Sequence, residues 1–146
     1  RPFARPLSAA IATTCMLGSL YFSEIVNYKP CRLCWYQRGA MYPLAILLII
    51  FTVLKTPRIA RIVVPIATIG AGISLYHWLL ERWPAIDTGS CSADAPCSVP
   101  YFEVFGFVSL AFMAFCAFVT VLVFLGVVSR ADAATMDAAK PTAVAK

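Results

Sequence analysis

Two cysteines three positions apart carry the clearest chemical signal in this sequence. Cys31 and Cys34 follow directly after Pro30, and an uncharged apolar run at 39–54 begins soon after them. A proline favours a helix start just after it, and the unpaired N–H groups at a helix start stabilise a thiolate. A disulfide across so short a loop constrains little unfolded-state entropy, so it is a weak structural staple. We therefore interpret the pair as a redox-active disulfide at the mouth of a membrane helix.

Arg38 lies one helical turn beyond Cys34, on the face that also carries Cys31. Its permanent charge would stabilise a thiolate, and its guanidinium could donate hydrogen bonds to an oxygen of a bound electron acceptor. An arginine at the edge of a membrane span is costly, which makes Arg38 a candidate functional residue. The alternative is that its side chain reaches out to lipid phosphates.

A second cysteine pair, Cys91 and Cys97, lies in the polar loop at 85–100. One interpretation is a shuttle disulfide, which would exchange with a partner protein on one side and with Cys31 and Cys34 on the other. The other is a simple loop staple, and the residues alone leave both open. The remaining cysteines, at 15 and 116, lie in apolar runs and are expected to be inert packing residues.

The elements that position these cysteines are predicted to be membrane helices. The chain has 146 residues, of which 61% are hydrophobic and 13% charged, more apolar surface than a soluble chain of this length can bury. A spanning helix needs about 20 apolar residues. We predict an all-α fold, a four-transmembrane-helix bundle, as a single membrane domain over 1–129. Its spans are expected at about 7–26, 31–54, 62–80 and 101–129, followed by a disordered cytoplasmic tail at 130–146.

The distribution of charge predicts the orientation of this bundle. The net charge is +5. Four spans put both termini and the 55–61 connector on one side, and most of the Lys and Arg residues fall there. Because basic residues accumulate on the cytoplasmic side, the termini are predicted to be cytoplasmic and the two cysteine-bearing loops to face outward. The outward side is oxidising, where disulfides persist. The basic balance is thus a topology signal, and no nucleic-acid partner is expected.

The first apolar run also has features of a signal peptide, since it follows basic residues and is rich in small ones. Cleavage would leave three spans and an outward C-terminus. We favour a retained first span, because the charges at 55–61 and the positions of the cysteines fit four spans better.

The chain resembles the DsbB/BdbC family of quinone-dependent disulfide-forming membrane proteins, most of all its BdbC-type branch. The resemblance covers about 21–112. It is carried by Pro-Cys-Arg-Leu-Cys-Trp-Tyr-Gln-Arg at 30–38, Met-Tyr-Pro-Leu at 41–44, Tyr-Phe-Ser-Glu at 21–24, Tyr-His at 76–77, and the stretch from 96–98 to 105–107.

The resemblance implies a role for each matching residue. Cys91 would form the mixed disulfide with a reduced thioredoxin-like thiol oxidase of DsbA/BdbD type, and Cys97 would pass electrons to Cys31. Cys34 would be the thiolate that faces the quinone. Arg38 would stabilise the charge of this thiolate and the charge on the quinone. His77 would line the quinone pocket. The quinone would be menaquinone or ubiquinone, and the protein would lie in the bacterial inner membrane, in contact with lipid.

Three other functions fit the residues less well than a quinone-dependent thiol oxidase does. A vitamin K epoxide reductase-like quinone reductase also has four spans, but there the two cysteine pairs occur in the opposite order. A structural zinc module with four thiolates is disfavoured, because the spacing of Cys91 and Cys97 lies outside the usual range and the outward compartment favours disulfides. No metal ligand is therefore expected. A scaffold subunit with incidental disulfides would not need Arg38 in its position.

Overall fold

The computed structural model describes residues 3–55, 60–89, 91, 94 and 96–138. Four α-helices make up most of this part of the chain. They are α1 (Ala4–Glu24), α2 (Arg32–Leu54), α3 (Ala60–Arg82) and α4 (Leu110–Ala138), with a short 3-10 helix, η2 (Pro84–Ile86), after α3. The basic residues expected at 1, 58, 140 and 146 lie outside the described residues.

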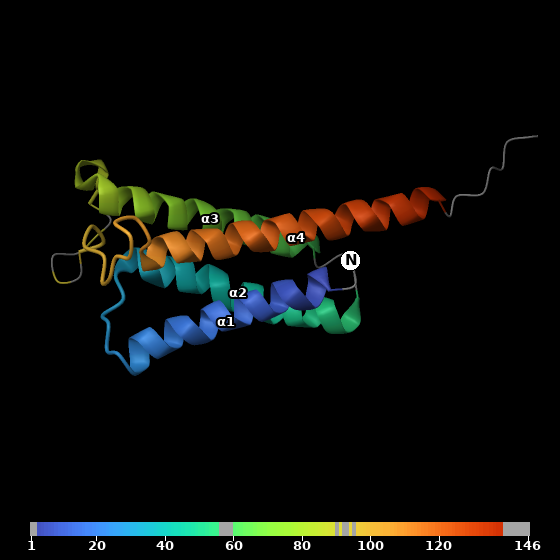
Figure 1. The fold of residues 1–146 in the computed structure, drawn as a ribbon, viewed down its shortest axis with the longest axis horizontal. Coiled ribbons are helices and arrows are strands. Elements are labelled where there is room, and N and C mark those ends of the chain that lie inside the picture. The colour runs from blue at the N-terminus through green and yellow to red at the C-terminus, as the bar shows by residue number, and fades with distance from the viewer. Residues whose placement is uncertain (1–2, 56–59, 90, 92–93, 95, 139–146) are drawn as a thin grey trace, which may run out of the picture.

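The four helices run alternately up and down in one bundle (Figure 1). The helix α1 packs against α2 and α4, and α3 packs against the same two helices. The loops that carry the cysteines therefore lie together at one end, and the α2–α3 connection lies at the other. This arrangement confirms the predicted all-α bundle.

Three helices are by themselves long and apolar enough to cross a membrane: α2, α3 and the Leu110–Arg130 part of α4. The helix α1 does not reach that level, since it carries Arg5, Pro6 and several Ser and Thr residues. Its buried positions are instead small residues, including Ser8, Ala9 and Ala12, which allow close approach to its neighbours.

The closest approach between α3 and α4 occurs at Gly70. A Cβ atom added there would overlap the ring of Phe118, which is fully buried on α4. The neighbouring Gly72 faces open space. The absence of a side chain at Gly70 thus lets Phe118 fill the centre of the bundle.

The fourth helix begins later than expected, at Leu110 and not at 101. Residues before it form a tight turn closed by an antiparallel bridge between Val104 and Val108, with Phe105 and Gly106 at positive φ. A left-handed backbone conformation interrupts a helix, which is why the apolar run alone misplaced this boundary. Ser109 then caps the helix by accepting a hydrogen bond from the N–H of Phe112 at 3.4 Å.

The prediction of a disordered tail at 130–146 is wrong for residues 130–138, because α4 continues to Ala138 (Figure 1). The stretch 130–138 is rich in alanine, the strongest helix former, and contains neither proline nor glycine. Residues 139–146 lie outside the described part of the chain.

Candidate functional site

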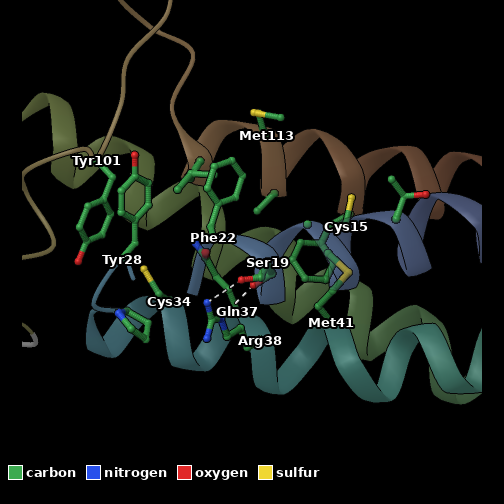
Figure 2. Close-up of a pocket in the computed structure, with 16 residues that line it drawn as sticks. Cys15, Ser19, Phe22, Tyr28, Cys34, Gln37, Arg38, Met41, Tyr101 and Met113 are labelled. Carbon is green, nitrogen blue, oxygen red and sulfur yellow. Dashed lines mark hydrogen bonds between the residues drawn. The ribbon is translucent and has the colours of Figure 1, made fainter. Parts of the chain in front are cut away.

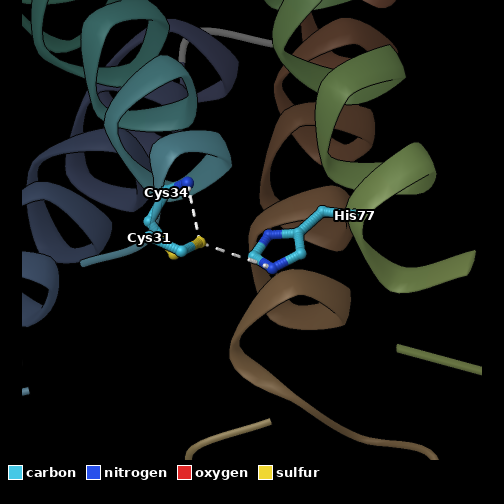
Figure 3. Close-up of side chains that lie close together, drawn as sticks. All are labelled: Cys31, Cys34 and His77. Atoms are coloured by element: carbon cyan, nitrogen blue, oxygen red, sulfur yellow. Dashed lines mark hydrogen bonds between the residues drawn. The ribbon is translucent and has the colours of Figure 1, made fainter. Parts of the chain in front are cut away.

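The Cys31/Cys34 pair lies at the predicted place, the N-terminus of α2. Cys31 is the N-cap residue, with an extended backbone, and its sulfur accepts a hydrogen bond from the N–H of Cys34 at 3.3 Å. The two Sγ atoms lie 2.7 Å apart and are not joined by a disulfide (Figure 3). A small torsional change would bring them to bonding distance, about 2.05 Å. The geometry at the start of α2 therefore holds two free thiols close enough to form a disulfide.

His77, from α3, lies against this pair (Figure 3). The side chain is buried, with 5% of its surface exposed, and its Nε2 atom is 3.7 Å from Sγ of Cys31. The amide Nε2 of Gln37 donates to His77 Nδ1 at 3.1 Å. Because the amide nitrogen can only donate, Nε2 of His77 carries the ring proton and points it at the Cys31 sulfur.

The charge of the pair is concentrated on Cys31. The hydrogen bond from the Cys34 thiol and the contact with His77 lower the pKa of Cys31 from 9.0 to about 4, against the effect of burial. A thiolate is the nucleophile in disulfide exchange. This lowered pKa favours the thiolate form of Cys31 at neutral pH.

Arg38 is hydrogen-bonded to two serines of α1, and Figure 2 shows its contact with Ser19. Its Nε donates to Ser19 Oγ at 2.9 Å, Nη2 donates to the Ser19 carbonyl at 3.0 Å, and Nη1 donates to Ser23 Oγ at 3.2 Å. Among the described residues no carboxylate forms an ion pair with it. These contacts disfavour the alternative in which Arg38 extends to lipid phosphates, since the guanidinium is turned toward α1.

A cavity of about 320 Å³ lies between α1, α2 and α4, next to Arg38 (Figure 2). Cys34 and Arg38 both line it, whereas Cys31 does not. His77, expected to line the acceptor pocket, is likewise absent from this wall, because α3 directs it to the other side of the cysteine pair. The lining residues are Thr14, Cys15, Gly18, Ser19, Phe22, Tyr28, Pro30, Cys34, Gln37, Arg38, Met41, Tyr101, Leu110, Met113, Ala114 and Phe118.

Two tyrosines close the loop end of this cavity. The rings of Tyr28 and Tyr101 stack with centroids 4.6 Å apart, and the Tyr101 hydroxyl donates to the carbonyl of Lys29. The contact joins the loop before Cys31 to the segment after Cys97.

The second cysteine pair is a disulfide between Cys91 and Cys97. Cys97 is almost fully buried and belongs to the same apolar cluster as Cys31, together with Leu33 and Leu80. The fold thus brings the two pairs together at one end of the bundle. A bonded pair offers no thiolate to a metal, so the structure does not support a zinc module with four thiolates.

Of the two other cysteines, one has the expected packing role and one does not. Cys15 packs against the main apolar cluster and also lines the cavity, whereas Cys116 is exposed on α4. A uniformly apolar helix gives no indication of which face turns inward, so their positions could not be read from the sequence.

Sequence reasoning missed the groups that hold the site in place. Ser19 and Glu81 were not singled out, and Ser23 and Gln37 were noticed only as parts of motifs. The two serines lie four positions apart on one face of an apolar helix, a polar stripe that could have indicated an internal partner. Glu81 is four positions after His77, and its Oε1 lies 4.0 Å from His77 Nε2.

Comparison with known proteins agrees with this geometry. Residues 2–128 match the family model described as disulfide bond formation protein DsbB. Disulfide bond formation protein C of Bacillus subtilis is 44% identical over 119 residues, which cover 81% of this chain and 86% of that protein. The probable disulfide formation protein C 1 of Bacillus anthracis is 48% identical over 108 residues, covering 73% of this chain and 78% of that protein.

A third relative, the probable disulfide formation protein C of Halalkalibacterium halodurans, is 43% identical over 113 residues, which cover 77% of this chain and 82% of that protein. No solved structure matches the chain. The family model spans most of the sequence and includes both cysteine pairs and Arg38. The chain therefore belongs to the DsbB family of disulfide bond formation proteins, and it is a membrane disulfide oxidoreductase.

Proposed function

We propose that this protein oxidises a thioredoxin-like partner through Cys91 and Cys97, and passes the electrons through Cys31 and Cys34 to a membrane quinone. The observation that carries the proposal is the position of the inner pair. Cys31 shares a buried cluster with Cys97, while Cys34 lines the cavity beside Arg38. The pair therefore connects the loop disulfide to the cavity.

The cavity has the chemistry that a quinone ring requires. Its walls are largely apolar and aromatic, including Phe22, Tyr28 and Phe118, and none of the described residues that line it is a carboxylate. Arg38 is the one cationic side chain among those lining residues, and it can donate a hydrogen bond to a carbonyl oxygen. A bound quinone would supply the oxidising power by accepting two electrons and two protons. Cys34 and Arg38 are the residues that would hold it.

Electron transfer between the pairs is thiol–disulfide exchange. A partner thiolate attacks Cys91, breaks the Cys91–Cys97 bond and releases Cys97 as a thiolate. The partner's second thiolate then attacks the partner sulfur of this mixed disulfide, which forms the partner's own disulfide and releases Cys91 as a thiolate. The Cys97 thiolate attacks Cys31 of the closed inner pair, and Cys34 leaves as a thiolate into the cavity. Attack of Cys91 on Cys97 restores the outer disulfide and frees Cys31.

Side chains around the inner pair stabilise the sulfurs of Cys31 and Cys34 when each is released from a disulfide. His77 directs a proton at Cys31 when that sulfur is released, and the charge of Arg38 stabilises the Cys34 thiolate at the cavity wall. The two electrons that enter at the outer pair thus leave at the cavity, and the inner disulfide forms again.

We further propose that both cysteine pairs face the extracytoplasmic side of the inner membrane and that both termini are cytoplasmic. The antiparallel order of the helices supports this orientation, because it puts the cysteine loops at one end and Lys55 with the α3 start at the other. In this orientation four spans would put eight of the twelve Lys and Arg residues of the sequence on the second side.

The test combines purified protein in detergent with a reduced thioredoxin-like partner and a short-chain quinone. Partner thiols and quinone absorbance should fall together in a one-to-one ratio of dithiol to quinone. Cys34→Ser should abolish quinone reduction, whereas Cys116→Ser, on the exposed face of α4, should leave it unchanged. Undiminished quinone reduction by Cys34→Ser would refute the proposed route.

A further inference from the structure

We propose that the reduced inner pair and His77 form a binding site for a thiophilic divalent cation such as Zn²⁺, and that an ion bound there blocks electron transfer. One ligand atom from each of Cys31, Cys34 and His77 lies within 4.8 Å of the other two (Figure 3). Two thiolates and one imidazole form a common zinc ligand set that leaves the fourth position open.

The distances fit tetrahedral coordination after one small adjustment. Zinc bonds of about 2.3 Å to sulfur and about 2.0 Å to nitrogen separate a sulfur from a nitrogen by ~3.6 Å and two sulfurs by ~3.8 Å. Cys31 Sγ and His77 Nε2 already lie 3.7 Å apart. The two sulfurs, now 2.7 Å apart, must separate by about 1 Å. Cys34 can supply this movement because it borders the cavity.

The charges also favour an ion at this place. A second thiolate at Cys34 would be repelled by that of Cys31, and partial burial makes the added charge costly unless it is compensated. A divalent cation neutralises both when it displaces the remaining thiol proton to solvent, and no electron moves in the exchange. The Glu81 carboxylate, with Oε1 4.0 Å from His77 Nε2, adds a further negative group near the three ligand atoms.

Gln37 supplies the support that a metal-bound histidine requires. Coordination through Nε2 moves the ring proton to Nδ1, which must then donate to an acceptor. A half-turn of the Gln37 amide, now 3.1 Å from Nδ1, presents its oxygen to that proton. His77 thus keeps a hydrogen bond in both states.

The site exists in only one redox state, because a closed Cys31–Cys34 disulfide has no thiolate to offer. An ion bound to the reduced pair occupies both sulfurs that would otherwise donate electrons. Free metal therefore traps the reduced enzyme, and conditions that keep the inner pair oxidised protect it. His77 is 46 positions from Cys31, so no linear motif reveals the ligand set.

The test measures metal binding directly, without partner or quinone, so its outcome is independent of the proposed electron route. The full chain with Cys91→Ala and Cys97→Ala, reduced under anaerobic conditions in detergent, is titrated with Zn²⁺ against a chromophoric chelator. One Zn²⁺ per chain is expected. His77→Ala should weaken binding at least about tenfold, as loss of even a supporting group does. Cys116→Ser should bind as tightly as its parent.

Cobalt provides a second measurement that does not depend on a variant. Co²⁺ added to the reduced parent should give the thiolate-to-metal charge-transfer absorption of a tetrahedral site, and oxidation of the pair should remove it. The proposal is overturned if the band does not form, if oxidised protein binds Zn²⁺ equally well, or if His77→Ala binds with unchanged affinity.

Discussion

Arg38 of α2 donates two hydrogen bonds to Ser19 of α1. Its Nε donates to the Ser19 hydroxyl at 2.9 Å, and its Nη2 donates to the Ser19 backbone carbonyl at 3.0 Å. The contact fixes Arg38, the one cationic group that the described residues contribute to the cavity wall, relative to Cys34. It also joins two helices that apolar packing alone would hold less specifically.

Ser19→Ala should weaken quinone binding without removing the charge. The backbone contact remains, so only part of the roughly 1.5–3 kcal/mol of a charged hydrogen bond is lost. We expect the KM for quinone to rise about three- to tenfold with kcat little changed. Steady-state kinetics with a short-chain quinone provides the measurement. Thr120→Ala, which removes a hydroxyl bonded within α4, is the matched control and should leave KM unaltered. A Ser19→Ala enzyme with the KM of the parent would contradict this role.

Cys31 should react with a small alkylating agent at a rate that is nearly independent of pH across the neutral range. Its pKa is lowered to about 4, so the thiolate is fully formed above that value and is lost only as the pH falls through it. An ordinary thiol would instead gain reactivity up to its pKa of about 8.5. Mass spectrometry of the Cys31 peptide follows the rate.

Two variants separate the causes of this low pKa. Cys34→Ala removes the strongest stabilising hydrogen bond and should raise the pKa of Cys31 most, while His77→Ala should raise it less. The pH at which alkylation reaches half its maximal rate reports both shifts. The reverse order of the two variants would show that His77, and not Cys34, is the main stabilising group.

Gly70→Ala should destabilise the bundle by about 1–3 kcal/mol, since the new methyl group would overlap the Phe118 ring in a filled core. Gly72→Ala is the matched control two positions away, where a Cβ meets nothing within 4 Å. It should be neutral or slightly stabilising, because alanine is the better helix former. Thermal unfolding in detergent compares the two. Adding Phe118→Leu should restore part of the loss, and equal Tm values for both glycine variants would exclude the steric explanation.

Reporter fusions should find the C-terminus in the cytoplasm and the loop at 85–100 outside. Four antiparallel spans would put both ends of the chain on one side, together with eight of the twelve Lys and Arg residues of the sequence. A fusion after Lys146 and a second one within the loop form the matched pair. An extracytoplasmic signal from the fusion after Lys146 would refute the proposed orientation.

Features that depend on local chemistry could be predicted from the amino-acid sequence. Pro30 and the apolar run after it indicated a helix start, so the position of Cys31 and Cys34 at the N-terminus of α2 could be predicted correctly. The lengths of the apolar runs predicted four helices, and the cysteine motif with Arg38 predicted the family. The predicted start of α4 was wrong because hydropathy does not report the positive φ values at Phe105 and Gly106.

Contacts between side chains that are distant in the sequence became visible only in the tertiary structure. The contacts of His77 with Cys31, of Arg38 with Ser19 and of Cys97 with the inner pair join separate segments of the chain. They depend on the rotation of each helix about its own axis. In a membrane bundle the outward and inward faces can be equally apolar, so sequence periodicity does not set that rotation. Close packing at points such as Gly70 and Phe118, together with internal hydrogen bonds, sets it instead.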